Sequence, residues 1–160
     1  MKKILLLLLL ISPALLAQGG TFYKIGDLLP AWELQDQFEK KKTLGDEVRM
    51  ILFSRDMDFK DLIHSMLIDE GERFLEEHET LYIADIHEMP SLITKLFALP
   101  KMREYPYRLF LDRDGEITKN LPTREGKVSL IRLERRKIIS IQYLSDMDQI
   151  KGEIRKEGLP

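Results

Sequence analysis

A short apolar run followed at once by a helical pattern is the feature that most constrains this fold. Residues 49–53 are mostly apolar and lead into a polar stretch, which is typical of a buried central strand. Beyond Asp58 the apolar residues recur at helical spacing and so share one face of a helix. They are Phe59, Leu62, Ile63, Met66 and Leu67. The pattern predicts a strand and then a helix with Asp58 as its N-cap, Asp61 in its first turn and a break or bend at Gly71.

The rest of the chain continues this alternation and then departs from it. Residues 80–86 predict the next strand, and Pro90 predicts the start of a helix that carries Leu92, Ile93, Leu96, Phe97 and Leu99. Further strands are expected at residues 107–111, 127–133 and 137–144, the last two as a hairpin, and a final helix is expected from Ser145. This order predicts a single α/β domain with a mixed central sheet flanked by helices on both faces.

The beginning of the sequence predicts a secretory signal peptide at residues 1–17. Lys2 and Lys3 precede an apolar run, and small residues lead from it into a polar stretch. A membrane span needs about 20 apolar residues, and this run is shorter and interrupted. We therefore expect cleavage after Ala17 or Gly19, a folded domain over residues 18–160, and no stable membrane span after cleavage. The expected location is the periplasm or the extracellular space.

The composition excludes several classes of function. The chain contains no cysteine, which excludes disulfides, thiolate metal sites and every mechanism with a Cys nucleophile or redox pair. Its formal net charge of −2 provides no overall field that would attract nucleic acid. The basic clusters at residues 40–42 and 132–137 lie among acidic residues and are explained as solvated turns, while the hairpin cluster leaves open a contact with anionic lipid heads or an acidic partner. We therefore expect no nucleic-acid partner.

Several segments carry a resemblance to a known superfamily. Residues 24–36 contain a Gly, a Pro and an Asp in the order found ahead of the first core strand of redoxins, and residues 105–117 contain a strand that ends in an Asp-x-x-Gly turn. Residues 50–58, 128–141 and 145–157 follow in matching order. The chain thus resembles the thioredoxin-like superfamily, in its redoxin and peroxiredoxin-like branch, and is similar to cysteine-free periplasmic proteins of the YtfJ type. The resemblance implies a thioredoxin-like fold.

The departures from that superfamily bear on function. Thioredoxin-type members have Cys-x-x-Cys at the start of the helix after the central strand, and the matching window identifies Asp56, Asp58 and Asp61 as a degenerate redox-site position. The family's cis-proline is also missing near Val128. A carboxylate cannot perform thiol-disulfide exchange, because that reaction needs a thiolate. We therefore expect no thiol-disulfide oxidoreductase or Cys peroxidase activity and no cofactor, but a non-catalytic binding or scaffold module with an unknown envelope protein as its partner.

Other patterns leave chemical alternatives open. Asp58, Asp61 and His64 could form a metal site or an acid-base centre, since residues three apart are neighbours on a helix. The other interpretation is a capped helix with a surface histidine.

Two further stretches invite the same comparison. His87 and Glu88 follow a strand at the end where α/β sheets bind ligands, either as an acid-base pair or as exposed loop residues. Residues 112–116 faintly resemble a calcium loop, although a strand-end turn explains them better.

Overall fold

The computed structural model describes residues 21–157, so the expected signal peptide and both cleavage positions lie outside the described residues. The strands are β1 (Glu33–Asp36), β2 (Lys41–Thr43), β3 (Met50–Phe53), β4 (Thr80–Asp85), β5 (Phe110–Asp112), β6 (Val128–Glu134) and β7 (Lys137–Leu144). The α-helices are α1 (Met57–Glu70), α2 (Phe74–Glu77), α3 (Ser91–Ile93), α4 (Leu99–Met102) and α5 (Met147–Arg155). A π-helix, η1 (Thr94–Ala98), joins α3 to α4, and a 3₁₀-helix, η2 (Thr118–Asn120), follows β5. No helix among residues 21–157 is long and apolar enough to cross a membrane.

The strands form one mixed sheet in the order β2-β1-β5-β4-β3-β6-β7. At its centre β3 pairs parallel with β4, and β4 pairs parallel with β5. The outer pairings are antiparallel, and β6 and β7 form the expected hairpin. Because parallel strands end at the same edge of a sheet, the loops after β3, β4 and β5 meet there. This edge carries the candidate site.

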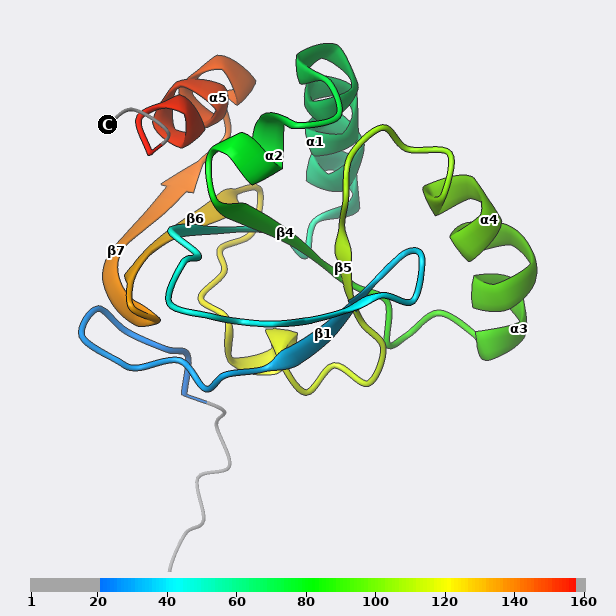
Figure 1. The fold of residues 1–160 in the computed structure, drawn as a ribbon, viewed down its shortest axis with the longest axis horizontal. Coiled ribbons are helices and arrows are strands. Elements are labelled where there is room, and N and C mark those ends of the chain that lie inside the picture. Colours follow the sequence, from blue (N-terminus) through cyan, green and yellow to red (C-terminus); the bar gives the residue numbers. More distant parts are fainter. Residues whose placement is uncertain (1–20, 158–160) are drawn as a thin grey trace, which may run out of the picture.

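Both faces of the sheet are buried, which explains why β3 and β4 consist almost wholly of apolar residues. Met50 and Leu52 face one core cluster, while Ile51 and Phe53 face the other. In these clusters, residues from α1, α2, α4 and α5 belong only to the first. Figure 1 shows α1, α2 and α5 together on that side of the sheet. The expected α/β sheet is confirmed, but the helices are less evenly placed than predicted: residues near the N-terminus and the segment around η2 cover the second face.

The start of α1 lies two residues earlier than the sequence pattern suggested. Its N-cap is Asp56, whose side chain accepts a hydrogen bond of 3.0 Å from the backbone N–H of Asp58. The prediction that Asp58 is the N-cap is therefore wrong. Asp58 instead lies in the first turn, and Asp61 lies beyond it. The helix ends as expected at Gly71, whose positive φ of 92° suits glycine.

This correction gives the first stability prediction. Asp56→Ala is expected to lower the free energy of unfolding by about 0.5–2 kcal/mol, because a backbone N–H loses its capping oxygen. Asp58→Ala is the matched control and is expected to cost about 0.3–1 kcal/mol, since only a favourable interaction with the helix dipole is lost. Urea unfolding of both variants measures the difference. A larger loss for Asp58→Ala would contradict the assignment of the cap.

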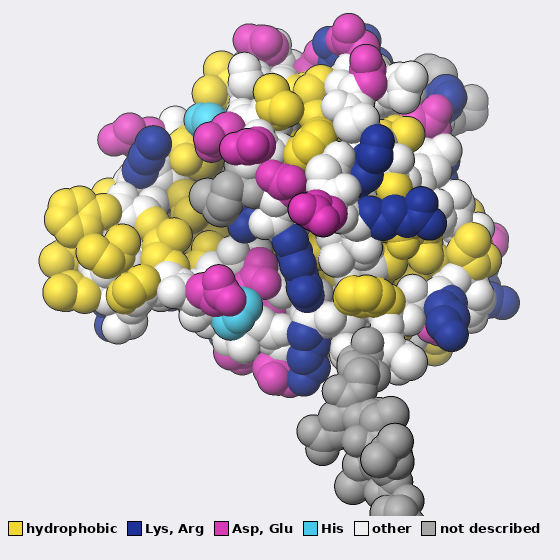
Figure 2. Space-filling view, turned by 180° about the vertical axis from the view of Figure 1, so that it is seen from behind, with side chains coloured by type: hydrophobic (Ala, Val, Ile, Leu, Met, Phe, Trp, Pro, Cys, Tyr) yellow, Lys and Arg dark blue, Asp and Glu magenta, His cyan; other side chains and the backbone are white. Residues whose placement is uncertain are grey.

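The segment after β4 differs most from expectation. The predicted helix forms, but Leu92, Ile93, Leu96 and Phe97 are exposed, whereas Leu99 is buried. We call these four exposed residues the apolar lobe; Figure 2 shows hydrophobic side chains gathered on this projecting part of the molecule. The orientation follows from the inward contacts, because Thr94 is buried and its hydroxyl donates to the carbonyl oxygens of Met89 and Pro90. Helical periodicity thus identified an apolar face that no described residue covers.

The C-terminal elements follow the sequence pattern closely. Arg135 and Arg136 form the two-residue turn between β6 and β7 with φ of 47° and 64°, as a primed turn requires. Helix α5 packs Ile150 and Ile154 into the core. Its N-cap is Asp146, not Ser145 as predicted, because the Asp146 side chain accepts from the backbone N–H of Gln149 at 2.8 Å.

Candidate functional site

A cleft of about 750 Å³ opens at the edge of the sheet where β3, β4 and β5 end. Its lining comes from the loops after these strands and from the first turn of α1. The lining residues are Arg55, Lys60, Asp85, Ile86, His87, Glu88, Met89, Asp114, Gly115, Glu116 and Lys119. Charges of both signs dominate this set, and none of these residues carries a thiol or a hydroxyl group. The cleft can therefore bind through charge and hydrogen bonds.

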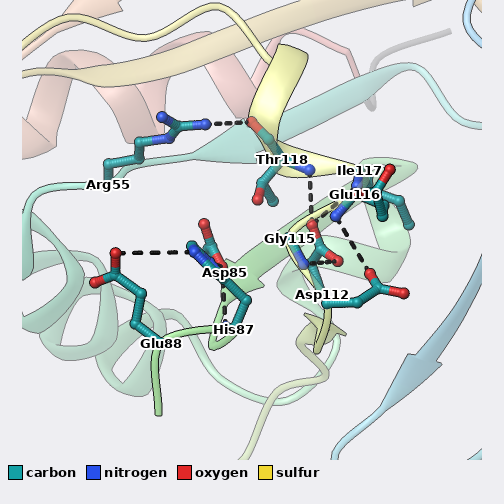
Figure 3. A network of polar contacts seen from close by, with 10 residues as sticks. Arg55, Asp85, His87, Glu88, Asp112, Gly115, Glu116, Ile117 and Thr118 are labelled. Atoms are coloured by element: carbon teal, nitrogen blue, oxygen red, sulfur yellow. Dashed lines mark hydrogen bonds and ion pairs between the residues drawn. The ribbon is translucent and has the colours of Figure 1, made fainter.

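His87 is held in the cleft by hydrogen bonds to Asp85. Its Nδ1 lies 2.6 Å from Oδ1 of Asp85, and the same oxygen accepts from the backbone N–H of His87 at 3.1 Å. The close-up in Figure 3 shows Asp85 and His87 together at the end of β4, with Glu88 beside them. Oε1 of Glu88 is 3.8 Å from His87 Nε2 and is largely exposed. The carboxylate partner of His87 is thus mainly Asp85, two residues before it, rather than Glu88.

The two groups shift each other's ionisation. The hydrogen bond to Asp85 and the charge of its carboxylate raise the pKa of His87 above 6.5. Burial by itself raises the pKa of Asp85, but the hydrogen bonds from the His87 ring and backbone outweigh it and lower this pKa overall. Pairing with Asp85 thus favours the protonated imidazole and keeps the ring in one orientation.

Gly115 fixes the other side of the imidazole. A Cβ atom at this position would lie 2.9 Å from Cγ of His87, and the backbone has a positive φ of 74°. Only glycine meets both conditions without strain. The loop after β5 therefore packs directly against the histidine supplied by β4.

Asp112 holds that loop in place. Its Oδ1 accepts from the backbone N–H of Gly115 at 3.0 Å, and its Oδ2 accepts from those of Ile117 and Thr118 at 3.0 and 2.7 Å (Figure 3). Burial raises the pKa of Asp112, and the hydrogen bond from the Thr118 backbone opposes this rise. Both oxygens are engaged with the backbone, so the strand-end turn is confirmed and the calcium-loop interpretation finds no support in this geometry.

Of the three aspartates that the sequence suggested as a degenerate redox-site position, only Asp56 makes a structural side-chain hydrogen bond within residues 21–157. Asp56 caps α1, and the preceding Arg55 donates from its guanidinium to the carbonyl oxygen of Thr118 at 2.7 Å. Asp58 and Asp61 are exposed on the helix. The end of β3 and the start of α1 are thus tied to the loop after β5 by Arg55.

His64 does not join Asp58 and Asp61 in a common site. Its Nδ1 lies 2.6 Å from the hydroxyl oxygen of Tyr107, and its ring centroid lies 4.1 Å from that of Tyr105. Burial and the charge of Lys101 lower the pKa of His64. Within residues 21–157 no group of three or more His, Asp or Glu side chains is arranged to hold a metal ion. His64 is therefore part of an aromatic cluster rather than a lone surface residue.

Sequence reasoning singled out His87 but missed Asp85 and Arg55. Arg55 lies shortly after the end of β3, and Asp85 is the last residue of β4. The available signal was therefore their position at the carboxyl ends of these two strands. The sequence could not show that the loops after β3 and β4 both contact the loop after β5.

The His87 pair yields a titration prediction. Asp85→Asn is expected to lower the pKa of His87 toward 6.5, because the imidazolium loses its anionic acceptor. Glu88→Gln, as the control, is expected to change it little, because Glu88 is more distant and 90% exposed. NMR titration of the ring protons measures both, with His64 expected to titrate below 6.5 in every variant. A His87 pKa unchanged in Asp85→Asn would contradict the pairing.

Comparisons with known proteins concern the fold alone. No family model and no curated protein matches the sequence. A thio-disulfide isomerase from Thermus thermophilus is similar with TM-score 0.52 and 18% identity, over 86% of this chain and 99% of that one. A thiol:disulfide interchange protein from Bacteroides sp. is similar with TM-score 0.52 and 12% identity, over 83% of this chain and 89% of that one. Peroxidoxin BcpB from Mycobacterium tuberculosis is similar with TM-score 0.50 and 16% identity, over 83% of this chain and 97% of that one. With its mixed sheet and these neighbours, the chain has a thioredoxin-like fold.

Proposed function

We propose that this chain is an exported, non-catalytic binding module of the cell envelope, which binds a charged segment of a partner protein in the cleft beside its degenerate redox position. The observation that carries the proposal is the cleft itself: it lies at the carboxyl ends of β3, β4 and β5, yet its lining offers charges of both signs and no thiol. Export rests on the pattern of residues 1–17 and on the similarity to YtfJ-type proteins.

Two polar groups in the cleft are held in place before any partner arrives. Arg55 is held by the Thr118 carbonyl, and His87 is held by Asp85 and Gly115. Groups already in position lose little conformational freedom on binding, so more of their interaction energy contributes to affinity. Such an arrangement suits recognition of a partner that carries both acidic and basic side chains.

Site-specific photo-crosslinking in the native envelope tests this proposal. A crosslinking residue at position 88 replaces a cleft side chain that is 90% exposed, and one at position 148 replaces an Asp that is 91% exposed on α5. We expect a discrete crosslinked partner from position 88 and none from position 148. Absence of a product at position 88, or the same product from both positions, would contradict cleft binding.

The same proposal predicts inactivity in redox assays. The purified protein is expected to neither reduce insulin disulfides nor consume hydroperoxide above a buffer blank, because both reactions need a cysteine thiol, which the chain lacks. A cysteine-containing redoxin serves as the positive control. Turnover that survives metal chelation would contradict the non-catalytic role.

The alternative is a metal-dependent or acid-base enzyme that uses Asp58, Asp61 and His64. Thermal melting with and without Ca²⁺, Mg²⁺, Mn²⁺ and Zn²⁺ separates it from the binding module, because a bound ion raises the melting temperature by mass action. A rise found in the wild type and lost in Asp58→Asn and Asp61→Asn would favour the alternative.

A further inference from the structure

We propose that the apolar lobe is a membrane-docking surface, which inserts its side chains into the interface of an anionic lipid bilayer. The four lobe residues expose large fractions of their surface: 65% for Leu92, 43% for Ile93, 59% for Leu96 and 64% for Phe97. The inference does not depend on the cleft or on what binds there.

The exposed side chains are held outward by the packing of their own segment. Leu99 is buried in the core, and Thr94 is fixed by its bonds to the backbone at the start of the segment. With these two positions facing inward, the apolar side chains just before Thr94 and between Thr94 and Leu99 face outward on a projecting part of the molecule (Figure 2). A convex apolar surface of this kind fits a deformable lipid interface.

The charges of the same segment favour an anionic surface. Residues 89–103 contain Lys95, Lys101 and Arg103 but no Asp or Glu, in a chain whose formal net charge is −2. Arg103 is turned to Gln37 and Glu39. Lys95 and Lys101 are exposed and form no ion pair with any residue from 21 to 157. Lysines flanking an apolar face can reach lipid phosphates while the apolar side chains enter the interface.

A second copy of this chain is a poorer occupant of the lobe. Two lobes facing each other would bring Lys95 and Lys101 against their own copies, which is electrostatically unfavourable. A fully exposed large apolar side chain presents about 200 Å² of surface. The four partly exposed lobe residues therefore offer only on the order of 400 Å² of apolar surface. A stable dimer typically buries about 800 Å² on each partner. Charge and area together therefore favour the bilayer.

Vesicle flotation measures the docking directly. The protein is isolated after export, so that wild type and variants share one N-terminus, and is mixed with vesicles of phosphatidylcholine with or without phosphatidylglycerol. We expect binding to the anionic vesicles, weaker binding to phosphatidylcholine alone, and further weakening with salt. Leu96→Ser with Phe97→Ser is expected to lower the partition coefficient at least about tenfold, because two apolar side chains no longer enter the interface.

Matched controls separate the lobe from general stickiness. Ile68→Ser and Ile139→Ser remove side chains that are each 48% exposed elsewhere, and are expected to leave partitioning unchanged. Lys95→Glu with Lys101→Glu is expected to remove the preference for phosphatidylglycerol while keeping all apolar residues. Thermal melts confirm that each variant is folded.

Three results would overturn the proposal. One is wild-type protein that stays unbound to both kinds of vesicle. Another is the Leu96→Ser, Phe97→Ser variant partitioning as well as the wild type. The third is a concentration-dependent dimer in sedimentation that these two substitutions abolish without any vesicle binding, which would assign the lobe to a second copy of the chain.

Discussion

Replacing Asp112 with alanine is expected to lower the free energy of unfolding by about 3–5 kcal/mol. The carboxylate is 2% exposed and accepts from three backbone N–H groups, of which those of Gly115 and Thr118 belong to buried residues. Without the carboxylate, these donors lose their acceptor in a place that water reaches poorly, at about 1–3 kcal/mol for each. Chemical denaturation at neutral pH measures the loss.

Asp114 provides the control for this prediction. It lies two residues later and also accepts a backbone N–H, that of Glu116 at 3.2 Å, but in an exposed position. Asp114→Ala is expected to cost less than about 1 kcal/mol, since water replaces the lost acceptor. Equal losses for the two variants would show that Asp112 does not anchor the loop. A selective loss at Asp112 is expected to be accompanied by a changed NMR environment of the His87 ring, which packs on Gly115.

Arg132→Met is expected to lower the free energy of unfolding by about 2 kcal/mol at neutral pH. The Arg132 guanidinium connects β6 to α5: its Nη2 lies 2.6 Å from Oε2 of Glu153, and its Nε donates to Glu157. The Arg132 and Glu153 side chains are only 16% and 20% exposed, so solvent screens the pair less than an ordinary surface pair. Methionine keeps most of the apolar stem but leaves both carboxylates without this partner.

The pH dependence identifies the ionic part of this effect. Hydrogen bonds from Arg132 and Lys156 lower the pKa of Glu153 from 4.5 to about 2. A carboxylate with a lowered folded-state pKa contributes stability above its unfolded pKa, and that contribution is lost as the pH falls through the folded-state value. The difference in the free energy of unfolding between wild type and Arg132→Met is therefore expected to be constant above pH 4.5 and to shrink as the pH falls toward 2. Lys156→Met is the control, because it removes the other partner of Glu153, which is 66% exposed. We expect it to lower the free energy of unfolding less than Arg132→Met does. A difference that persists unchanged at pH 2 would exclude the ion pair as its cause.

Much of the fold could be predicted because the decisive signals are local. The run that became β3 and the central residues 81–84 of β4 are apolar since each strand faces a core cluster on both sides. The β6–β7 hairpin, the break at Gly71 and the turn at Gly115 follow from the alternation of residues and from glycine's freedom to adopt positive φ. The uneven placement of helices on the two faces could not be predicted, because irregular segments near the N-terminus and η2 cover the second face as well as a helix would.

The candidate site was less predictable because it depends on contacts between distant loops. Spacing identified Asp56, Asp58 and His64 as neighbours in sequence, but backbone geometry at Asp56 decides which aspartate caps α1, and Tyr107 decides what His64 contacts. The pairing of Arg55 with Thr118 spans 63 positions of sequence. The apolar lobe shows the same limit: periodicity identifies an apolar face, and only the tertiary structure shows whether another element covers it.

The two edge strands of the sheet bear on how this protein behaves at high concentration. An unpaired edge strand can recruit a strand from another chain and so start aggregation. At one edge, β2 is only three residues long and begins with Lys41 and Lys42, whose charges repel an identical strand. At the other edge, a register shift in the pairing with β6 interrupts the regularity of β7, and a bridge between Leu28 and Lys137 occupies its first residue. Both edges therefore resist strand addition, and a domain without disulfides gains protection against fibril-like association from a short charged strand and an interrupted register.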